Sequence, residues 1–149
     1  MPESVLFVDR ANACLSAIAE FAFRKATRFT IPATSAGISP GYGFLHWHAR
    51  ELLRDEGWDF EHFLSFRSKK ASGGLLASHD LVVAFSAGDA EALKSGFPGH
   101  ADKVVQLSDL CGVAGEVRDP CDESWQSDSK FRETFRRLVE CSLEICGRA

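Results

Sequence analysis

The chain has 149 residues, of which 45% are hydrophobic and 26% are charged, and its net charge is −4. This length and composition fit a single globular domain, residues 1–149, that can bury a core of its own. The acidic balance argues against a nucleic-acid partner, and the lack of an apolar run of roughly 20 residues argues against a membrane-spanning segment.

The first quarter of the chain predicts a strand, a helix and a second strand. Residues 5–8 form a short continuous apolar run, which is typical of a strand buried on both faces. Apolar residues at helical spacing follow in residues 15–26. Residues 29–34 predict a second strand, and Pro32 within it suits the edge of a sheet better than the centre.

The middle of the chain continues this alternation. A Gly-, Pro- and Ser-rich stretch at residues 35–43 predicts a loop, and residues 48–56 predict a helix that ends at Gly57. The clearest buried strand is predicted at residues 81–85, followed by a helix at residues 89–94.

The last third of the chain predicts one more strand and a long helix. Residues 104–107 predict the fourth strand, residues 110–128 a loop, and the C-terminal segment a helix with Phe131 and Phe135 on its apolar face. Strands that alternate with helices form right-handed crossovers and a parallel sheet covered on both faces. The sequence therefore predicts a small three-layer α/β domain.

In such a sheet, ligands bind beyond the carboxyl ends of the strands. The first strand-to-helix turn, residues 9–16, is therefore the candidate site. A turn of this kind can aim several backbone N–H groups at one point and so form a nest for an anion.

Four stretches resemble one known family. They are the apolar strand before Asn12-x-Cys14-x-Ser16, the run Thr34-Ser35-Ala36-Gly37, the run 79–85, and Asp119-Pro120 ahead of the closing helix. Together they are similar to the low-molecular-weight tyrosine phosphatases over nearly the full chain. The resemblance implies a three-layer αβα fold with a four-stranded parallel sheet in flavodoxin-like order, without a cofactor or metal.

The chemistry of that family is nucleophilic. A loop cysteine attacks phosphorus, a loop arginine holds the phosphoryl oxygens, and the aspartate of the Asp-Pro loop protonates the leaving group. Under the resemblance, Asp9 stands at the nucleophile position and Leu15 at the arginine position. Ala11 stands at a loop glycine, which would cost about 1 kcal/mol if a positive φ is needed there.

Other loop positions agree with the family. Asn12 and Ser16 match the residues that brace the loop, Cys14 matches a second loop cysteine, and Asp119 matches the general acid. Arg10 and Ala13 complete the predicted nest, residues 10–16. A carboxylate at position 9 could fill the nest with its own oxygens and repel a phosphate dianion.

These residues lead to one main hypothesis, a catalytically silent pseudophosphatase that binds a protein or small-molecule ligand. The first alternative is a repurposed enzyme that uses Asp9 and Asp119 as a carboxylate acid–base pair. A weaker alternative is a slow phosphomonoesterase. Its nucleophile would be Asp9 or Cys14, and Arg10 would replace the missing clamp.

A second group of candidates follows the loop at residues 35–43. Tyr42, Phe44, His46 and Trp47 fall in the segment that, under the resemblance, forms a wall of the substrate cleft. This wall could contact a ligand or partner, or could serve packing alone. His46 and His48 also allow a metal hypothesis, but residues two apart point apart on a helix, so a surface histidine pair at a helix entry is favoured.

Five cysteines, an odd number without a Cys-x-x-Cys pair, predict free thiols in a reducing compartment. The N-terminal residues show no secretory signal, so we predict a cytoplasmic protein. The expected oligomeric state is a monomer or a weak homodimer.

Overall fold

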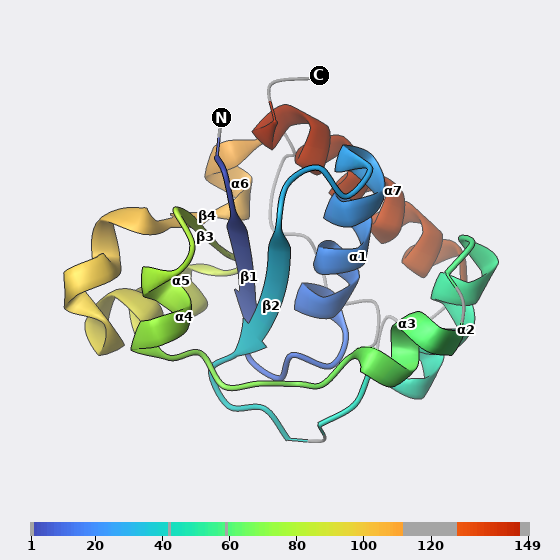
Figure 1. The fold of residues 1–149 in the computed structure, drawn as a ribbon, viewed down its shortest axis with the longest axis horizontal. Helices are drawn as coiled ribbons and strands as arrows, with labels where there is room; N and C mark the ends of the chain where they lie inside the picture. Colours follow the sequence, from blue (N-terminus) through green and yellow to red (C-terminus); the bar gives the residue numbers. More distant parts are fainter. Residues whose placement is uncertain (1, 42, 59, 112–127, 147–149) are drawn as a thin grey trace.

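The computed structural model describes residues 2–41, 43–58, 60–111 and 128–146. Its centre is one sheet of four parallel strands in the order β2-β1-β3-β4 (Figure 1). The strands are β1 (Val5–Asp9), β2 (Ala33–Gly37), β3 (Leu81–Ala84) and β4 (Val104–Gln106). This parallel α/β architecture with flavodoxin-like strand order confirms the predicted fold class.

Strand β1 lies inside the sheet because both of its neighbours pair with it along nearly its full length. Val8 is opposite Ala36 of β2 on one side and Ala84 of β3 on the other. All five residues of β1 are buried, which explains why its sequence is a continuous apolar run rather than an alternating one. The strand therefore delivers its last residue, Asp9, to the carboxyl edge of the sheet from a fixed position.

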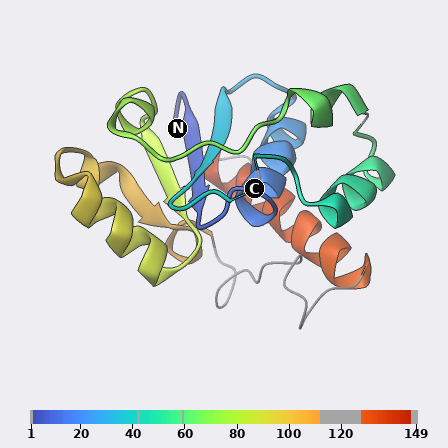
Figure 2. The same cartoon turned by 90° about the horizontal axis from the view of Figure 1, so that it is seen from below.

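Helices cover both faces of the sheet, which Figure 2 shows from below the view of Figure 1. On one face lie α1 (Leu15–Thr27), α2 (Trp47–Asp55), α3 (Phe60–Ser65) and α7 (Asp128–Ile145). On the other lie α4 (Gly73–Ala77), α5 (Ala87–Gly96) and the 3-10 helix η1 (Pro98–Lys103), while the short α6 (Leu107–Leu110) follows β4.

The sheet divides the core into two apolar clusters. The larger cluster joins β1 to α1, α2 and α7 and includes Phe7, Phe21 and Phe131. The smaller one, with Leu6, Val82 and Leu93, lies under α4 and α5. Because residues along β1 alternate between the two clusters, its register fixes both layers at once.

The predicted second strand is wrong in its bounds. Strand β2 begins at Ala33 and includes residues 35–37, which were expected to belong to the loop. Arg28 and Phe29 instead take left-handed conformations, with φ of 52° and 60°, and end helix α1. The prediction that Pro32 places this strand at an edge is confirmed, because β2 is the first strand of the sheet order.

The prediction of free thiols is wrong for Cys14, Cys111 and Cys141, which are all disulfide-bonded. Cys111, just after α6, and Cys141 of α7 form a disulfide, with their Cα atoms 5.4 Å apart. They are 30 residues apart in the chain, so no local spacing signals the bond. The cytoplasmic location stays a prediction, now without support from Cys14, Cys111 and Cys141. No helix in the described parts of the chain has the length and apolar character required to cross a bilayer.

Candidate functional site

The predicted nest lies at the carboxyl edge of the sheet, between the last residue of β1 and the first turn of α1 (Figures 1 and 2). The carbonyl of Cys14 already accepts the first α1 hydrogen bond, from the N–H of Ile18 at 2.7 Å. The first backbone N–H groups of a helix have no partner within it and attract negative charge. The turn therefore has the geometry expected of an anion-binding loop.

The side chain of Asp9 occupies this nest. Its Oδ1 accepts hydrogen bonds from the Asn12 N–H at 2.8 Å and from the Ser16 hydroxyl at 2.7 Å, and its Oδ2 accepts from the Ser16 N–H at 3.3 Å. The residue is only 7% exposed. The carboxylate thus takes up two of the backbone donors that an external anion would need.

Burial and hydrogen bonding act on the Asp9 carboxyl in opposite directions. Desolvation raises its pKa above the ordinary value of 3.8, while the bonds from Ser16 and Asn12 lower it, and the desolvation is the larger effect. Its pKa is therefore raised despite the surrounding donors. A carboxyl with a raised pKa holds its proton to a higher pH than an exposed aspartate.

Asn12 braces the turn from inside. It adopts a left-handed conformation with φ of 53°, which asparagine tolerates better than most residues. Its Nδ2 donates to the Ser16 hydroxyl at 3.0 Å, and its Oδ1 accepts from the Lys69 N–H at 3.0 Å. Ala11 does not take a positive φ, so the strain considered for that position is absent.

Two segments far along the chain hold the turn in place. Gly37, at the end of β2, lies so close that a Cβ atom there would be 2.8 Å from the Arg10 carbonyl oxygen. Ser68 donates its hydroxyl hydrogen to the Asn12 carbonyl at 2.6 Å. Residues 68 and 69 therefore support the nest from a distant part of the chain.

The remaining loop residues divide between core and solvent. Leu15 and Cys14 are buried members of the larger apolar cluster, and Ala13 is buried beside them. Arg10 is exposed, and Ala11 is half-buried. Cys14 is buried and disulfide-bonded, so it offers no thiolate to attack an external substrate, and Leu15 contributes to the core rather than to anion binding.

Two predicted site residues, Asp119 and Tyr42, lie outside the described residues. The structure therefore does not test the proposed pairing of Asp9 with Asp119.

The aromatic segment after β2 is largely exposed. Phe44 and Trp47 are 57% and 56% exposed, and the Arg67 guanidinium lies 4.9 Å from the Phe44 ring centre. His46 caps helix α2, because its Nδ1 accepts the His48 N–H at 3.2 Å. The predicted histidine pair does lie at a helix entry, but His48 is buried, so the expected surface position of the pair is wrong. Among the described residues, no three His, Cys, Asp or Glu side chains meet in a way that could hold a metal.

Sequence reasoning overlooked the supporting role of Gly37, Ser68 and Lys69. The run Thr34-Ser35-Ala36-Gly37 is one of the motifs of the family resemblance, and the close approach at Gly37 gives the physical reason for its glycine. Ser68 and the Lys69 backbone carried no signal, since their contacts to Asn12 span 56 and 57 residues of chain.

A parallel α/β sheet with an anion-binding turn after its first strand is the architecture of small phosphate-handling domains. A family model described as low molecular weight phosphotyrosine protein phosphatase matches residues 4–145. The chain therefore belongs to this family. No curated protein matched the chain.

Solved structures agree with this assignment. A low molecular weight protein tyrosine phosphatase from T. tengcongensis is 28% identical, with a TM-score of 0.84 over 98% of this chain and 99% of that one. A YwlE mutant from Bacillus subtilis is 27% identical, with a TM-score of 0.83 over 97% of each chain. A YwlE arginine phosphatase with a phosphorylated active-site serine is 25% identical, with a TM-score of 0.83 over 97% of this chain and 94% of that one.

Proposed function

We propose that this protein is a pseudophosphatase, a family member without thiol phosphatase chemistry that acts as a binding or regulatory module. The observation that carries the proposal is the Asp9 carboxylate, which accepts three hydrogen bonds inside the nest. A phosphate group would have to displace this carboxylate from its donors and would be repelled by its charge.

The lost groups support the same conclusion. By the resemblance, Asp9 takes the place of the nucleophilic cysteine, and a carboxylate so deeply hydrogen-bonded is a poor nucleophile. Leu15 takes the place of the phosphate-binding arginine, and its side chain is part of the core. Loss of a hydrogen bond to a charged group typically costs about 1.5–3 kcal/mol. Together these changes remove both the attacking group and the substrate clamp.

One observation favours the alternative, in which Asp9 works as an acid or base with Asp119. The pKa of Asp9 is raised by burial, as is common for catalytic carboxyls. Against it, both Asp9 oxygens already accept hydrogen bonds from the nest, so proton transfer to a ligand would require the carboxyl to leave its donors. The binding module therefore remains the better-supported proposal.

The exposed aromatic residues Phe44 and Trp47 are the surface through which we expect such a module to contact its partner. Exposed aromatic side chains offer large apolar contact areas and are enriched at protein interfaces. The partner itself remains an unidentified protein or small molecule.

The test is titration of the protein with phosphate and vanadate by calorimetry, together with turnover assays. The substrates are p-nitrophenyl phosphate and phosphoarginine, because one relative is described as an arginine phosphatase. We expect neither binding nor turnover by the natural protein. Oxyanion binding at the nest or hydrolysis of either substrate would contradict the proposal.

Two variants make the negative result informative. Asp9→Cys/Leu15→Arg restores the residues that the resemblance assigns to catalysis, and it should gain measurable phosphatase activity. Asp9→Cys alone is the matched control, which should remain weaker because the clamp is still absent. Thermal unfolding of both variants checks that Leu15→Arg, a change at a buried position, leaves the fold intact.

A further inference from the structure

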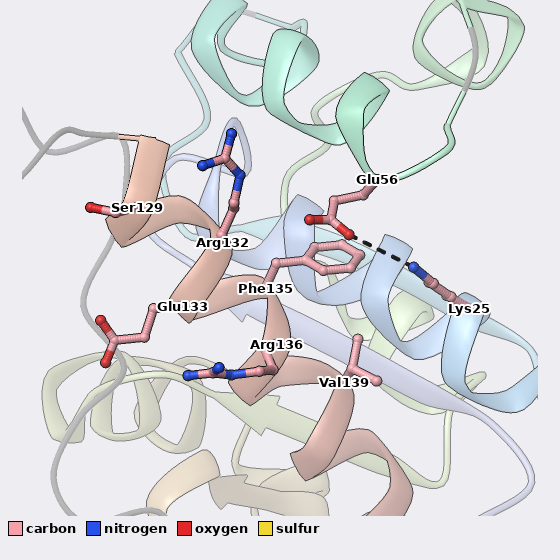
Figure 3. Close-up of a pocket in the computed structure, with 8 residues that line it drawn as sticks. All are labelled: Lys25, Glu56, Ser129, Arg132, Glu133, Phe135, Arg136 and Val139. Atoms are coloured by element: carbon pink, nitrogen blue, oxygen red, sulfur yellow. Dashed lines mark ion pairs between the residues drawn. The ribbon is translucent and has the colours of Figure 1, made fainter.

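A groove on the α1–α7 face lies away from the nest. It consists of two cavities of about 540 and 400 Å³ that share Lys25 and Glu56 in their walls. Figure 3 shows the first cavity, where the Lys25–Glu56 ion pair stands beside the Phe135 ring. The nest lies at the N-terminal end of helix α1, and the groove lies beside its C-terminal end. The helix has 13 residues, so the two sites are about 20 Å apart.

The groove carries positive charge, although the whole chain has a net charge of −4. Its cationic residues are Lys25, Arg28, Arg132 and Arg136. Of its two acidic residues, Glu56 pairs with Lys25 at 3.8 Å, and Glu133 pairs with Arg137 at 3.1 Å. The three arginines form no ion pair with any described residue, so their charge favours an anionic occupant.

The smaller cavity also has an aromatic wall. Phe29 is 61% exposed. Its ring packs edge-to-face with the Trp58 ring, with their centroids 5.8 Å apart. Phe29 holds this position with φ of 60°, a conformation that costs energy in a residue other than glycine. An exposed ring next to Lys25 and Arg28 offers a stacking surface beside positive charge.

Trp58, which also lines this cavity, has an unpaired hydrogen-bond donor. It is 94% buried, being only 6% exposed, and its indole Nε1 is the one buried side-chain nitrogen or oxygen without a hydrogen-bond partner among the described residues. Leaving a buried donor unpaired is unfavourable. The Nε1 atom is enclosed, so an acceptor oxygen on a ligand in this cavity would satisfy it only if binding brings the indole N–H to the cavity surface.

We propose that the cavity formed by Lys25, Arg28, Phe29 and Trp58 binds an aromatic carboxylate. The aromatic ring of the ligand stacks on Phe29, and its carboxylate pairs with the cationic residues and accepts the Trp58 N–H. The site is independent of the state of the nest, so it does not rest on the protein being a pseudophosphatase.

The test follows the indole N–H signals of the three tryptophans by NMR in ¹⁵N-labelled full-length protein. The probe is 2-naphthoate, and Trp58→Phe assigns the Trp58 signal by its disappearance. We expect saturable binding with a downfield shift of the Trp58 signal. The neutral amide of the same ring and cyclohexanecarboxylate, which lacks the aromatic ring, should each bind at least about tenfold more weakly.

Variants distinguish binding in this cavity from nonspecific binding elsewhere on the protein. Arg28→Gln and Phe29→Gly should each weaken 2-naphthoate binding about tenfold or more. Phe29→Gly is suited to the test because glycine accepts the positive φ, so the fold is retained. Lys94→Gln on α5 and Leu64→Ala on α3, which remove an exposed charge and an exposed apolar side chain outside the groove, should leave the affinity unchanged.

A second titration, with a short peptide that ends in phenylalanine, tests whether the natural ligand is the carboxyl end of a peptide or a small molecule. Tighter binding of the peptide than of its C-terminal amide would assign the site to peptide carboxyl ends, and preference for 2-naphthoate would assign it to small molecules. The proposal is overturned if no probe shifts the Trp58 signal, or if the amide binds as tightly as the carboxylate. It also fails if the two control variants weaken binding as much as Arg28→Gln does.

Discussion

The Oδ1 atom of Asp9 and the hydroxyl oxygen of Ser16 lie 2.7 Å apart and join the end of β1 to the first turn of α1. The Ser16 N–H donates to the other carboxylate oxygen at 3.3 Å, so one residue of the helix contacts both oxygens. The two residues are seven apart in the chain, and the turn between them closes around this contact. The nest is therefore shaped around an anion that belongs to the protein itself.

Ser16→Ala should destabilise the protein by about 1.5–3 kcal/mol, because it removes a hydrogen bond to a buried carboxylate. It also leaves the Asn12 side-chain amide without its acceptor. The free energy of unfolding, measured by urea titration, gives the value. Ser95→Ala, at an exposed serine of α5, is the control and should change stability by less than about 0.5 kcal/mol. Equal effects of the two changes would show that the Asp9–Ser16 contact contributes little.

Stability should depend on pH through Asp9 in a defined direction. Because burial raises the pKa of Asp9 in the folded state above 3.8, the folded protein keeps a proton that the unfolded chain has already released. The resulting contribution to stability is complete below pH 3.8 and is lost as the pH rises through the folded pKa. Burial also raises the pKa of Glu20 above 4.5, so this group adds a loss of the same sign.

The measurement is the free energy of unfolding of the natural protein and of Asp9→Asn across this pH range. The difference, natural protein minus variant, should decrease as the pH rises from 3.8 and become constant above the folded pKa of Asp9. Glu51→Gln, an exposed change on α2, serves as the control. A difference that increases with pH would mean that the pKa of Asp9 is lowered rather than raised.

Gly37→Ala should destabilise the protein by about 1–3 kcal/mol, the usual cost of overpacking. The new Cβ would lie 2.8 Å from the Arg10 carbonyl oxygen and 3.1 Å from the Asn12 Cβ, and backbone atoms cannot move aside easily. Gly96→Ala, at the end of α5 with no atom within 4 Å of its Cβ, is the matched control and should be neutral or slightly stabilising. Thermal unfolding of both variants is the measurement. A loss of stability in Gly37→Ala alone would indicate the tight contact, and an equal loss in both variants would contradict it.

The disulfide between Cys111 and Cys141 should contribute roughly 3–4 kcal/mol, because it closes a loop of 30 residues in the unfolded chain. Peptide mapping of the non-reduced protein should identify the bond. Chemical denaturation should show that Cys111→Ala/Cys141→Ala is less stable than the oxidised protein by this amount. Recovery of both cysteines as alkylated thiols from the natural, non-reduced protein would contradict the prediction.

The sequence alone is enough to predict the α/β class, the burial of β1 on both faces and the turn that forms the candidate site. Continuous apolar strands such as residues 5–8 appear only where both faces are buried, and this property is local to the strand. The family resemblance, with Asp9 and Leu15 as its departures, was also visible in the sequence alone. The error at residues 29–32 arose because Arg28 and Phe29 end helix α1 in left-handed conformations, although the side chains of residues 29–31 favour a strand.

The arrangement of the site follows from tertiary contacts alone. The orientation of the Asp9 carboxylate depends on Ser16, and the shape of the turn depends on contacts with Gly37 and Ser68 that span distant parts of the chain. The Cys111–Cys141 bond likewise requires α6 and α7 to meet. Such contacts leave no periodic pattern in the sequence. They depend on which distant segments the parallel sheet brings to the same edge, and this is fixed only when the chain packs.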